Sequence, residues 1–233
     1  MKTYTNQGTD ILSLFHPVIA RWFQDRIGTP TDIQVQTWQQ VSSGGHVLIT
    51  APTGSGKTLA AFLWAINQLA TRKIESGFTS VLYISPLRAL NNDIQRNLLR
   101  PLEELKVRFK EAGLDFPDIS VETRSGDTPQ AERARMLRHP PEILITTPES
   151  LNLLVSSAGG RTNLKDLSCV ILDEVHAVVG TKRGVYLMTA VERLVPLSGE
   201  FQRISLSATI RSPETAAQFI GGYRMSGNPA HPE

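Results

Sequence analysis

The sequence Ala-Pro-Thr-Gly-Ser-Gly-Lys-Thr at residues 51–58 constrains the fold of this chain more than any other feature. A short run at 46–50 precedes it and reads as a buried strand, and a run at 59–66, apolar nearly all round, reads as a helix. Glycines at a strand-to-helix turn allow backbone N–H groups to point inward around a phosphate, at the positive end of the helix dipole. The segment therefore predicts an α/β fold with a nucleoside triphosphate site at this turn.

Two side chains complete the predicted phosphate cradle. Lys57 supplies a positive charge to the phosphates, and the hydroxyl of Thr58 is suited to bind magnesium. Ala51 stands where the strict pattern has glycine, but the strand and helix on either side support the same prediction. The predicted triphosphate-binding residues in this loop are Pro52, Thr53, Gly54, Ser55, Gly56, Lys57 and Thr58.

The composition is typical of one intracellular α/β domain. The 233 residues are enough for a single large domain. A formal net charge of +2 permits nucleic-acid binding without arguing for it, so any basic surface is local. The single cysteine, Cys169, lies in an apolar run and reads as a buried structural thiol. Because there is only one cysteine, an internal disulfide is excluded and a zinc site is disfavoured. No stretch approaches membrane-spanning length and residues 1–10 lack a signal-peptide core, so we expect a cytoplasmic protein without a membrane partner.

The chain alternates short β-rich runs with longer helical ones, which predicts a mostly parallel sheet covered by helices on both faces. A helical apolar stripe passes through Ile94, and Pro101 is expected to start the next helical segment. We expect one domain at 1–225, with its last helix at 213–220, and a linker or truncated end at 226–233. The expected strands are 47–50, 81–85, 119–123, 143–146, 170–172 and 203–207.

A pair of carboxylates narrows the class of protein, which the cradle alone leaves open among kinases, GTPases, transporters and motors. Asp173 and Glu174 directly follow the strand expected at 170–172, at the sheet edge where ligands bind in open α/β folds. We interpret Asp173 as a magnesium ligand together with Thr58, and Glu174 as the group that orients or deprotonates the attacking water. Asp173, Glu174 and Lys57 form the predicted catalytic group.

Several further polar residues are candidates for the same site. His176 lies three residues after the predicted metal carboxylate, and Ser207 and Thr209 end the last expected strand. Their hydroxyls are able to hydrogen-bond the His176 region and so couple the hydrolytic site to a distant surface. Upstream, the amide of Gln34 offers one donor and one acceptor to an adenine edge, while a helix N-cap at Thr31 explains the same segment without a ligand. The two interpretations of this segment are compatible.

Taken in order, these motifs resemble the first RecA-like lobe of a superfamily 2 DExH-box helicase. Within that superfamily the chain is similar to the Lhr-type (large helicase-related) proteins. The resemblance covers nearly the whole chain, and it implies ATP-driven movement along a nucleic-acid strand, in Lhr-type enzymes usually 3′ to 5′ on DNA and in repair. The segments that carry it are 30–34, 51–66, 85–90, 123–128, 147–150, 173–176, 180–184 and 207–209.

The resemblance also implies partners. Helicases of this kind bind ATP and Mg²⁺ between two RecA-like lobes, and the second lobe supplies arginines to the reaction. No second sheet pattern follows Thr209, so we expect that lobe elsewhere in the same parent protein. A single strand of DNA or RNA is expected to lie along the loops that follow the sheet. The residues that the resemblance assigns to strand contacts are Pro86, Arg88, Arg124, Gly126, Asp127, Thr147 and Pro148.

Two function classes remain open from the sequence. The first is the motor lobe of an ATP-dependent helicase, with DNA favoured over RNA as the strand and an RNA-directed DExH helicase as its variant. The second is a nucleotide- and strand-binding module that hydrolyses little or no ATP by itself. A small-molecule P-loop kinase is disfavoured, because it leaves Thr147, Pro148 and the segment 207–209 without a role.

Overall fold

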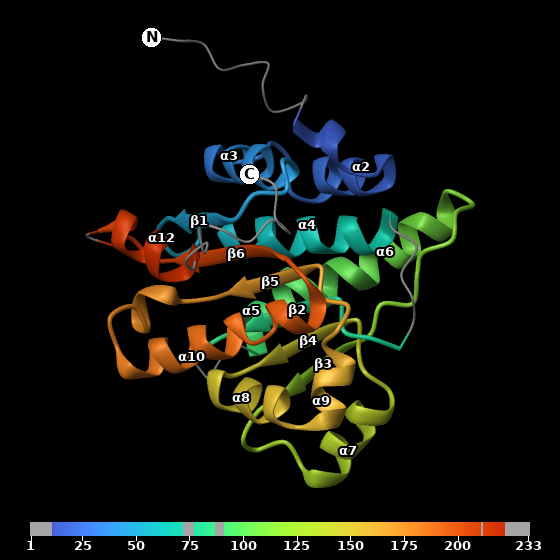
Figure 1. The fold of residues 1–233 in the computed structure, drawn as a ribbon. Coiled ribbons are helices and arrows are strands. Elements are labelled where there is room, and N and C mark those ends of the chain that lie inside the picture. The colour runs from blue at the N-terminus through green and yellow to red at the C-terminus, as the bar shows by residue number, and fades with distance from the viewer. Residues whose placement is uncertain (1–10, 72–76, 87–90, 211, 222–233) are drawn as a thin grey trace.

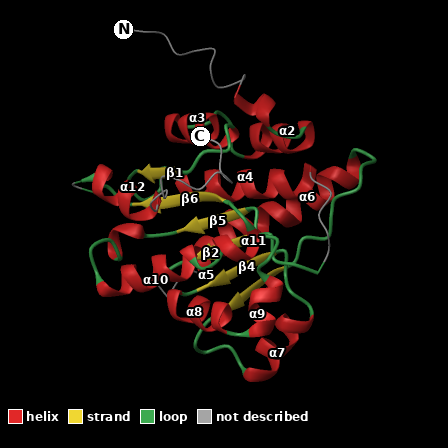
Figure 2. Ribbon diagram, in the orientation of Figure 1, coloured by secondary structure: helices red, strands yellow, loops and turns green. Residues whose placement is uncertain are grey.

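The computed structural model of the protein describes residues 11–71, 77–86, 91–210 and 212–221 (Figure 1). Arg88 and the end expected at 226–233 lie outside these ranges. Helices lie on both faces of a central sheet, as the alternating pattern predicted (Figure 2).

The centre of the fold is a six-stranded sheet with the strand order β1-β6-β5-β2-β4-β3. Every strand pairing in it is parallel. All six expected strands are confirmed, and the largest difference in a bound is two residues, at the start of β3. The strands are β1 (Val47–Thr50), β2 (Val81–Ile84), β3 (Val121–Arg124), β4 (Ile143–Thr146), β5 (Cys169–Leu172) and β6 (Gln202–Ser207).

The helices connect successive strands and cover the sheet. Within the described ranges, none of them combines the length and the apolar character needed to cross a membrane. The α-helices are α2 (Pro17–Arg26), α3 (Asp32–Ser42), α4 (Lys57–Thr71), α5 (Asn91–Ile94), α6 (Arg100–Glu111), α7 (Gln130–Arg138), α8 (Pro148–Ser156), α9 (Ala158–Asn163), α10 (Lys182–Glu192), α11 (Val195–Ser198) and α12 (Pro213–Gly221). The other helical segments are the 3₁₀ turns η1 (Leu12–Leu14) and η3 (Val175–Ala177) and the π-helical turn η2 (Gln95–Leu99).

Alternation along the strands builds a core on each face of the sheet. In β2, Val81 and Tyr83 belong to the core under α4, and Leu82 and Ile84 belong to the core under α8 and α10. Both faces of the inner strands are therefore apolar, as their near-continuous apolar sequences predicted. Helix α4 is apolar nearly all round because it packs between the sheet and α3.

Trp38 of α3 fixes the N-terminal helices onto α4. The side chain is fully buried, and its indole Nε1 donates a hydrogen bond to the carbonyl oxygen of Ala60 at 3.1 Å. The rings of Phe15 and Phe23 pack edge-on against it, with centroids 4.8 and 5.3 Å away. This packing holds the start of α3 close to the loop that follows β1, where Thr31 donates to the carbonyl oxygen of Ser55 at 3.2 Å.

Pro101 begins a new helical segment, as expected, but without a break in the chain. Helix α6 starts at Arg100, and the π-helical turn η2 joins it directly to α5. Pro101 has no N–H to donate to the carbonyl four residues back. The preceding turn is widened, and the N–H of Arg100 bonds to Gln95, five residues back.

The carboxyl ends of all six strands meet at one edge of the sheet because the strands are parallel. Strands β1, β6 and β5 lie side by side in one half of the sheet and lead into the loop 51–58, the segment 207–209 and the segment 173–176. Strands β2, β4 and β3 form the other half and lead into the residues predicted to contact DNA or RNA. The order of the β-strands thus separates the predicted nucleotide site from the predicted nucleic-acid contacts, and the two meet where β5 pairs with β2.

Candidate functional site

The loop between β1 and α4 has the backbone that a phosphate cradle requires. Gly54 and Gly56 have φ values of +84° and +89°, which an L-residue adopts only with strain. A Cβ atom on Gly56 would also lie 2.7 Å from Nε2 of Gln34. The two glycines are therefore required by conformation, and a side chain at Gly56 would also displace the amide end of Gln34.

The two side chains predicted to complete the cradle begin α4. Lys57 is only 5% exposed, and its Nζ donates to the carbonyl oxygen of Pro52 at 3.4 Å. Thr58 follows it and is half-buried. The hydroxyl of Ser55, in the same loop, is buried and has no hydrogen-bond partner among the described residues. An unsatisfied hydroxyl and a buried ammonium at a helix N-terminus favour an anionic ligand.

Gln34 forms a capping box with Thr31 at the start of α3. Its Oε1 accepts from the N–H of Thr31 at 2.9 Å, and the hydroxyl of Thr31 accepts from the N–H of Gln34 at 3.4 Å. The predicted N-cap is confirmed. Gln34 is only 2% exposed, and one lone pair of its amide oxygen is used by the cap. The contact to an adenine edge stays a prediction that is compatible with this cap.

Asp173 is held at the end of β5 by contacts to β2. Its N–H donates to the carbonyl oxygen of Ile84 at 2.8 Å, and its Oδ1 accepts from the N–H of Glu174 at 2.9 Å. Its Oδ2 accepts from the phenol of Tyr83. Among the described non-glycine residues, Glu174 alone has a positive φ, 50°. Backbone strain of this kind gathers at active sites, where the surrounding contacts maintain it.

The electrostatics of Asp173 reflect its burial. Desolvation raises the pKa of its carboxyl group, the hydrogen bond from Tyr83 acts in the opposite direction, and the charge of Glu174 raises it further. Lys57 lies close enough to lower the pKa of the same group. Burial also raises the pKa of Tyr83, and the neighbouring Asp173 adds to that rise. The phenol therefore stays protonated and donates to the carboxylate.

The donor set fits a magnesium ion that is shared with a nucleotide. Among the residues that the structure describes, no three His, Cys, Asp or Glu side chains gather into a group able to hold a metal by themselves. Magnesium in nucleotide sites commonly takes one or two protein oxygens and completes its coordination with phosphates and water. Asp173 and Thr58 match that pattern.

His176 lies between the predicted base and the segment after β6, but the connection differs from the one predicted. Its Nδ1 accepts from the N–H of Ala208 at 3.2 Å and lies 3.1 Å from Oε2 of Glu174. The hydroxyl of Ser207 is buried without a partner among the described residues, and Thr209 is exposed. The contact is thus made by a backbone amide and not by the two hydroxyls.

The loop after β3 is built as a tight turn and held by a residue that sequence reasoning missed. Arg133 of α7 donates to the carbonyl oxygens of Gly126 and Thr128 at 2.5 and 2.7 Å. Gly126 and Asp127 remain exposed at the tip of this turn. The periodicity of α7 offered no signal for this role, because an exposed arginine on a helix is normally solvated.

The other residues predicted to contact a nucleic-acid strand are more buried than expected. Arg124 is 9% exposed, and its Nη1 is buried with no hydrogen-bond partner in the described part of the chain. Burial and then the charge of Arg133 lower its pKa. Thr147 caps α8 by accepting from the N–H of Ser150 at 3.3 Å, and Pro148 and Pro86 are buried. Arg124 shares a small, mostly apolar hollow with Met136 of α7 and Leu144 of β4, so it is a desolvated charge and not a solvated surface residue.

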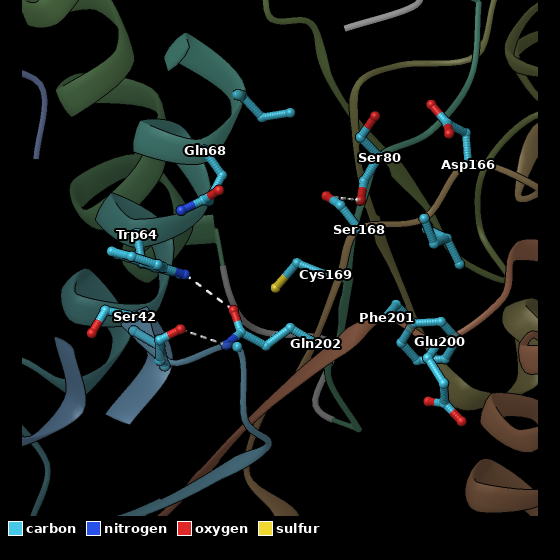
Figure 3. A pocket seen from close by; sticks show the side chains of 14 residues that line it. Ser42, Trp64, Gln68, Ser80, Asp166, Ser168, Cys169, Glu200, Phe201 and Gln202 are labelled. Atoms are coloured by element: carbon cyan, nitrogen blue, oxygen red, sulfur yellow. Dashed lines mark hydrogen bonds between the residues drawn. The ribbon is translucent and has the colours of Figure 1, made fainter. Parts of the chain in front are cut away.

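A hollow of about 640 Å³ lies at the opposite, amino edge of the sheet (Figure 3). There Gln202 accepts from the indole of Trp64 at 3.0 Å and donates to the carbonyl oxygen of Val41 at 2.8 Å. The described residues that line it include Asp166 and Glu200 and no lysine or arginine. This lining does not suit a triphosphate, and none of the predicted site residues belongs to it.

Comparison with known proteins agrees with the site at the carboxyl edge. The sequence pattern of the DEAD/DEAH box helicases matches residues 31–217. The chain is 49% identical over 220 residues to "Lhr helicase/ probable uracil glycosylase" of Mycolicibacterium smegmatis, covering 94% of this chain and 14% of that protein. It is 45% identical over 231 residues to "ATP-dependent helicase Lhr-Core protein 2" of Thermococcus barophilus, covering 98% of this chain and 26% of that one. It thus spans about a quarter or less of these relatives.

The fold is also similar to a solved helicase lobe. The structure of Mycobacterium smegmatis helicase Lhr bound to single-stranded DNA and AMP-PNP superposes with a TM-score of 0.83 at 48% identity. The match covers 89% of this chain and 26% of that one. The RecA-like architecture expected from the sequence is confirmed.

The contact between Thr31 and the phosphate loop is testable with a matched pair of caps. Thr31→Val and Thr181→Val each remove a hydroxyl that caps a helix and also donates to a carbonyl oxygen outside that helix, of Ser55 for Thr31 and of Val178 for Thr181. Each variant should lose about 1 kcal/mol of stability in urea unfolding. Only Thr31→Val should weaken binding of a fluorescent ATP analogue, because only Thr31 holds the phosphate loop. Equal nucleotide affinities in the two variants would contradict this.

Proposed function

The chain belongs to the DEAD/DEAH box helicase family, and on that premise we propose that it is the ATP-binding motor lobe of an ATP-dependent nucleic-acid helicase. One observation carries the proposal most directly. The buried ammonium of Lys57 and the buried carboxylate of Asp173 lie at the same sheet edge and interact electrostatically. In phosphoryl transfer, an ammonium at a helix N-terminus contacts the phosphates, and a carboxylate that follows a parallel strand holds the metal.

Each residue of this edge has a distinct role. Lys57 donates to the phosphates, and the N–H groups of the loop around Gly54 and Gly56 cradle them. Asp173 and Thr58 hold Mg²⁺, which neutralises charge on the phosphate oxygens when bound. Glu174, fixed at a positive φ beside Asp173, orients the attacking water and accepts its proton.

His176 connects this chemistry to the rest of the lobe. Its Nδ1 accepts from the N–H of Ala208 at 3.2 Å and lies 3.1 Å from Oε2 of Glu174, so this nitrogen can bond to only one of the two at a time. A change in the position of Glu174 therefore disturbs the segment that contains Ser207 and Thr209. We propose coupling between hydrolysis and strand movement through this path, although the hydroxyls play a smaller part than the backbone of Ala208.

The proposed strand is single-stranded DNA, bound through its backbone. What supports DNA is the similarity to Lhr, whose structure was solved with single-stranded DNA. Along the carboxyl edge, Pro86, Thr147 and the turn at Gly126 and Asp127 follow three adjacent strands. The N-terminus of α8 favours phosphates there, and nothing in this set is suited to read bases. Arg124 is assigned to the same strand by the resemblance, and its buried guanidinium would have to be uncovered to reach a phosphate.

The proposal extends to the setting of the protein. A second RecA-like lobe of the same parent protein would complete the ATP site with arginines, which in related phosphoryl transfer contribute on the order of 10³ to 10⁵ in rate. We further propose a role in DNA repair and a cytoplasmic location. The resemblance to Lhr-type proteins supports the first, and the single buried Cys169 is consistent with the second.

Two variants separate binding from chemistry in the full-length protein. Lys57→Ala should abolish tight ATP binding, because it removes the buried ammonium of the cradle. Glu174→Gln should keep nucleotide affinity and lower ATP turnover by about 10² or more, because the amide retains the shape but cannot accept a proton. Nucleotide titration and steady-state turnover measure the two effects. An equal loss of ATP affinity in both variants would remove Glu174 from its catalytic role.

The strand-binding proposal predicts a change in salt dependence. If Arg124 neutralises one phosphate, Arg124→Gln should make the slope of log affinity against log salt less steep by about 0.7, for any sequence of single-stranded DNA. Arg138→Gln is the matched control, because it removes an exposed arginine from the last turn of α7, which leads to the amino end of β4. Equal slopes for wild type and Arg124→Gln would show that Arg124 does not neutralise a phosphate. Affinities for RNA oligonucleotides of the same length test the preference for DNA.

A further inference from the structure

Tyr83 is a fully buried tyrosine on the strand that divides the two halves of the sheet edge. It lies in β2 and is paired in register with Ile145 of β4 and Ile171 of β5. Its ring stacks on Phe62 of α4, with centroids 4.9 Å apart and an angle of 28° between the planes. A phenylalanine would fill this apolar space equally well, so the hydroxyl group needs a separate explanation.

The hydroxyl reaches the carboxylate that is proposed to bind magnesium. Tyr83 Oη donates to Oδ2 of Asp173, and the N–H of Glu174 donates to Oδ1 at 2.9 Å. Asp173 is 5% exposed, so water has little access to satisfy the carboxylate in place of these donors. Its orientation therefore depends on two fixed protein groups.

We propose that Tyr83 is a positioning residue that aims the Asp173 carboxylate at the magnesium of the nucleotide site. The inference rests on the proposed function, since it concerns the metal of that site. A carboxylate turns about its Cβ–Cγ bond, and a donor fixed to one oxygen sets which lone pairs of the group face the ligand. Donors of this kind commonly change metal affinity by about 10- to 100-fold when removed.

The stack on Phe62 gives Tyr83 its own support. Phe62 is fully buried in α4, the helix that begins with Lys57 and Thr58. The same rigid element thus carries the two proposed ligands of the phosphates and the metal, and also fixes the ring whose hydroxyl orients Asp173. Together these contacts set the distance across the site from β5 to the start of α4.

The test is a magnesium titration of nucleotide binding in the full-length protein. A fluorescent ATP analogue is held at constant concentration while Mg²⁺ is varied, for wild type, Tyr83→Phe and the matched control Tyr186→Phe, whose phenol is exposed. Tyr83→Phe should raise the half-saturating Mg²⁺ concentration about tenfold. Affinity for the analogue in EDTA should be unchanged, and Tyr186→Phe should match wild type in both measurements.

A second variant guards against a loss of folding in Tyr83→Phe. Phe62→Leu keeps the phenol and removes the stack, and it should also raise the half-saturating Mg²⁺ concentration. Wild-type values in either folded variant would overturn the inference, because a tyrosine that merely fills the core affects the unfolding midpoint and not the magnesium dependence. Absence of magnesium-dependent binding in wild type would instead overturn the proposed function.

Discussion

The parallel order β1-β6-β5-β2-β4-β3 is the constraint on which the rest of the structure depends. It brings six loops to one edge and sorts them by chemistry, with the phosphate loop and the acidic pair on one side and the proposed strand contacts on the other. Each group lies on adjacent strands although its members are far apart in the chain. Two ligands can therefore bind the same lobe without competing for the same residues.

The border between the two halves is the pairing of β5 with β2, and the buried Asp173 lies at that border. A carboxylate with this little exposure needs donors, and β2 supplies one through the phenol of Tyr83. The carbonyl oxygen of Ile84 at the end of β2 accepts from the N–H of Asp173 and fixes its backbone. Pro86, a proposed contact of the nucleic-acid strand, follows β2 two residues after its end. A shift of β2 on binding of a nucleic-acid strand near Pro86 would thus move Tyr83, three residues away, and with it the donor to the Asp173 carboxylate.

The sequence predicted the fold and the main chemistry because these depend on local patterns. The apolar runs of the β-strands, the glycines of the phosphate loop and the adjacent carboxylates can each be recognised within a few consecutive residues. The contacts that differed depend on packing between distant elements. The contact from the Tyr83 phenol to Asp173, the backbone donor at Ala208 and the burial of Arg124 could not be derived before the sheet order was known. Gln34 differs from these, because its helix-capping role follows from the local pattern of Thr31 and Gln34 and is confirmed.

The most direct test of this account is an experimental structure of the protein with AMP-PNP and magnesium. The account predicts the triphosphate over the start of α4, between Gly54 and Thr58, and the metal within coordinating distance of Asp173 and Thr58. A nucleotide bound in the hollow at the amino edge beside Trp64, or a metal held away from Asp173, would contradict the assignment of the carboxyl edge as the ATP site.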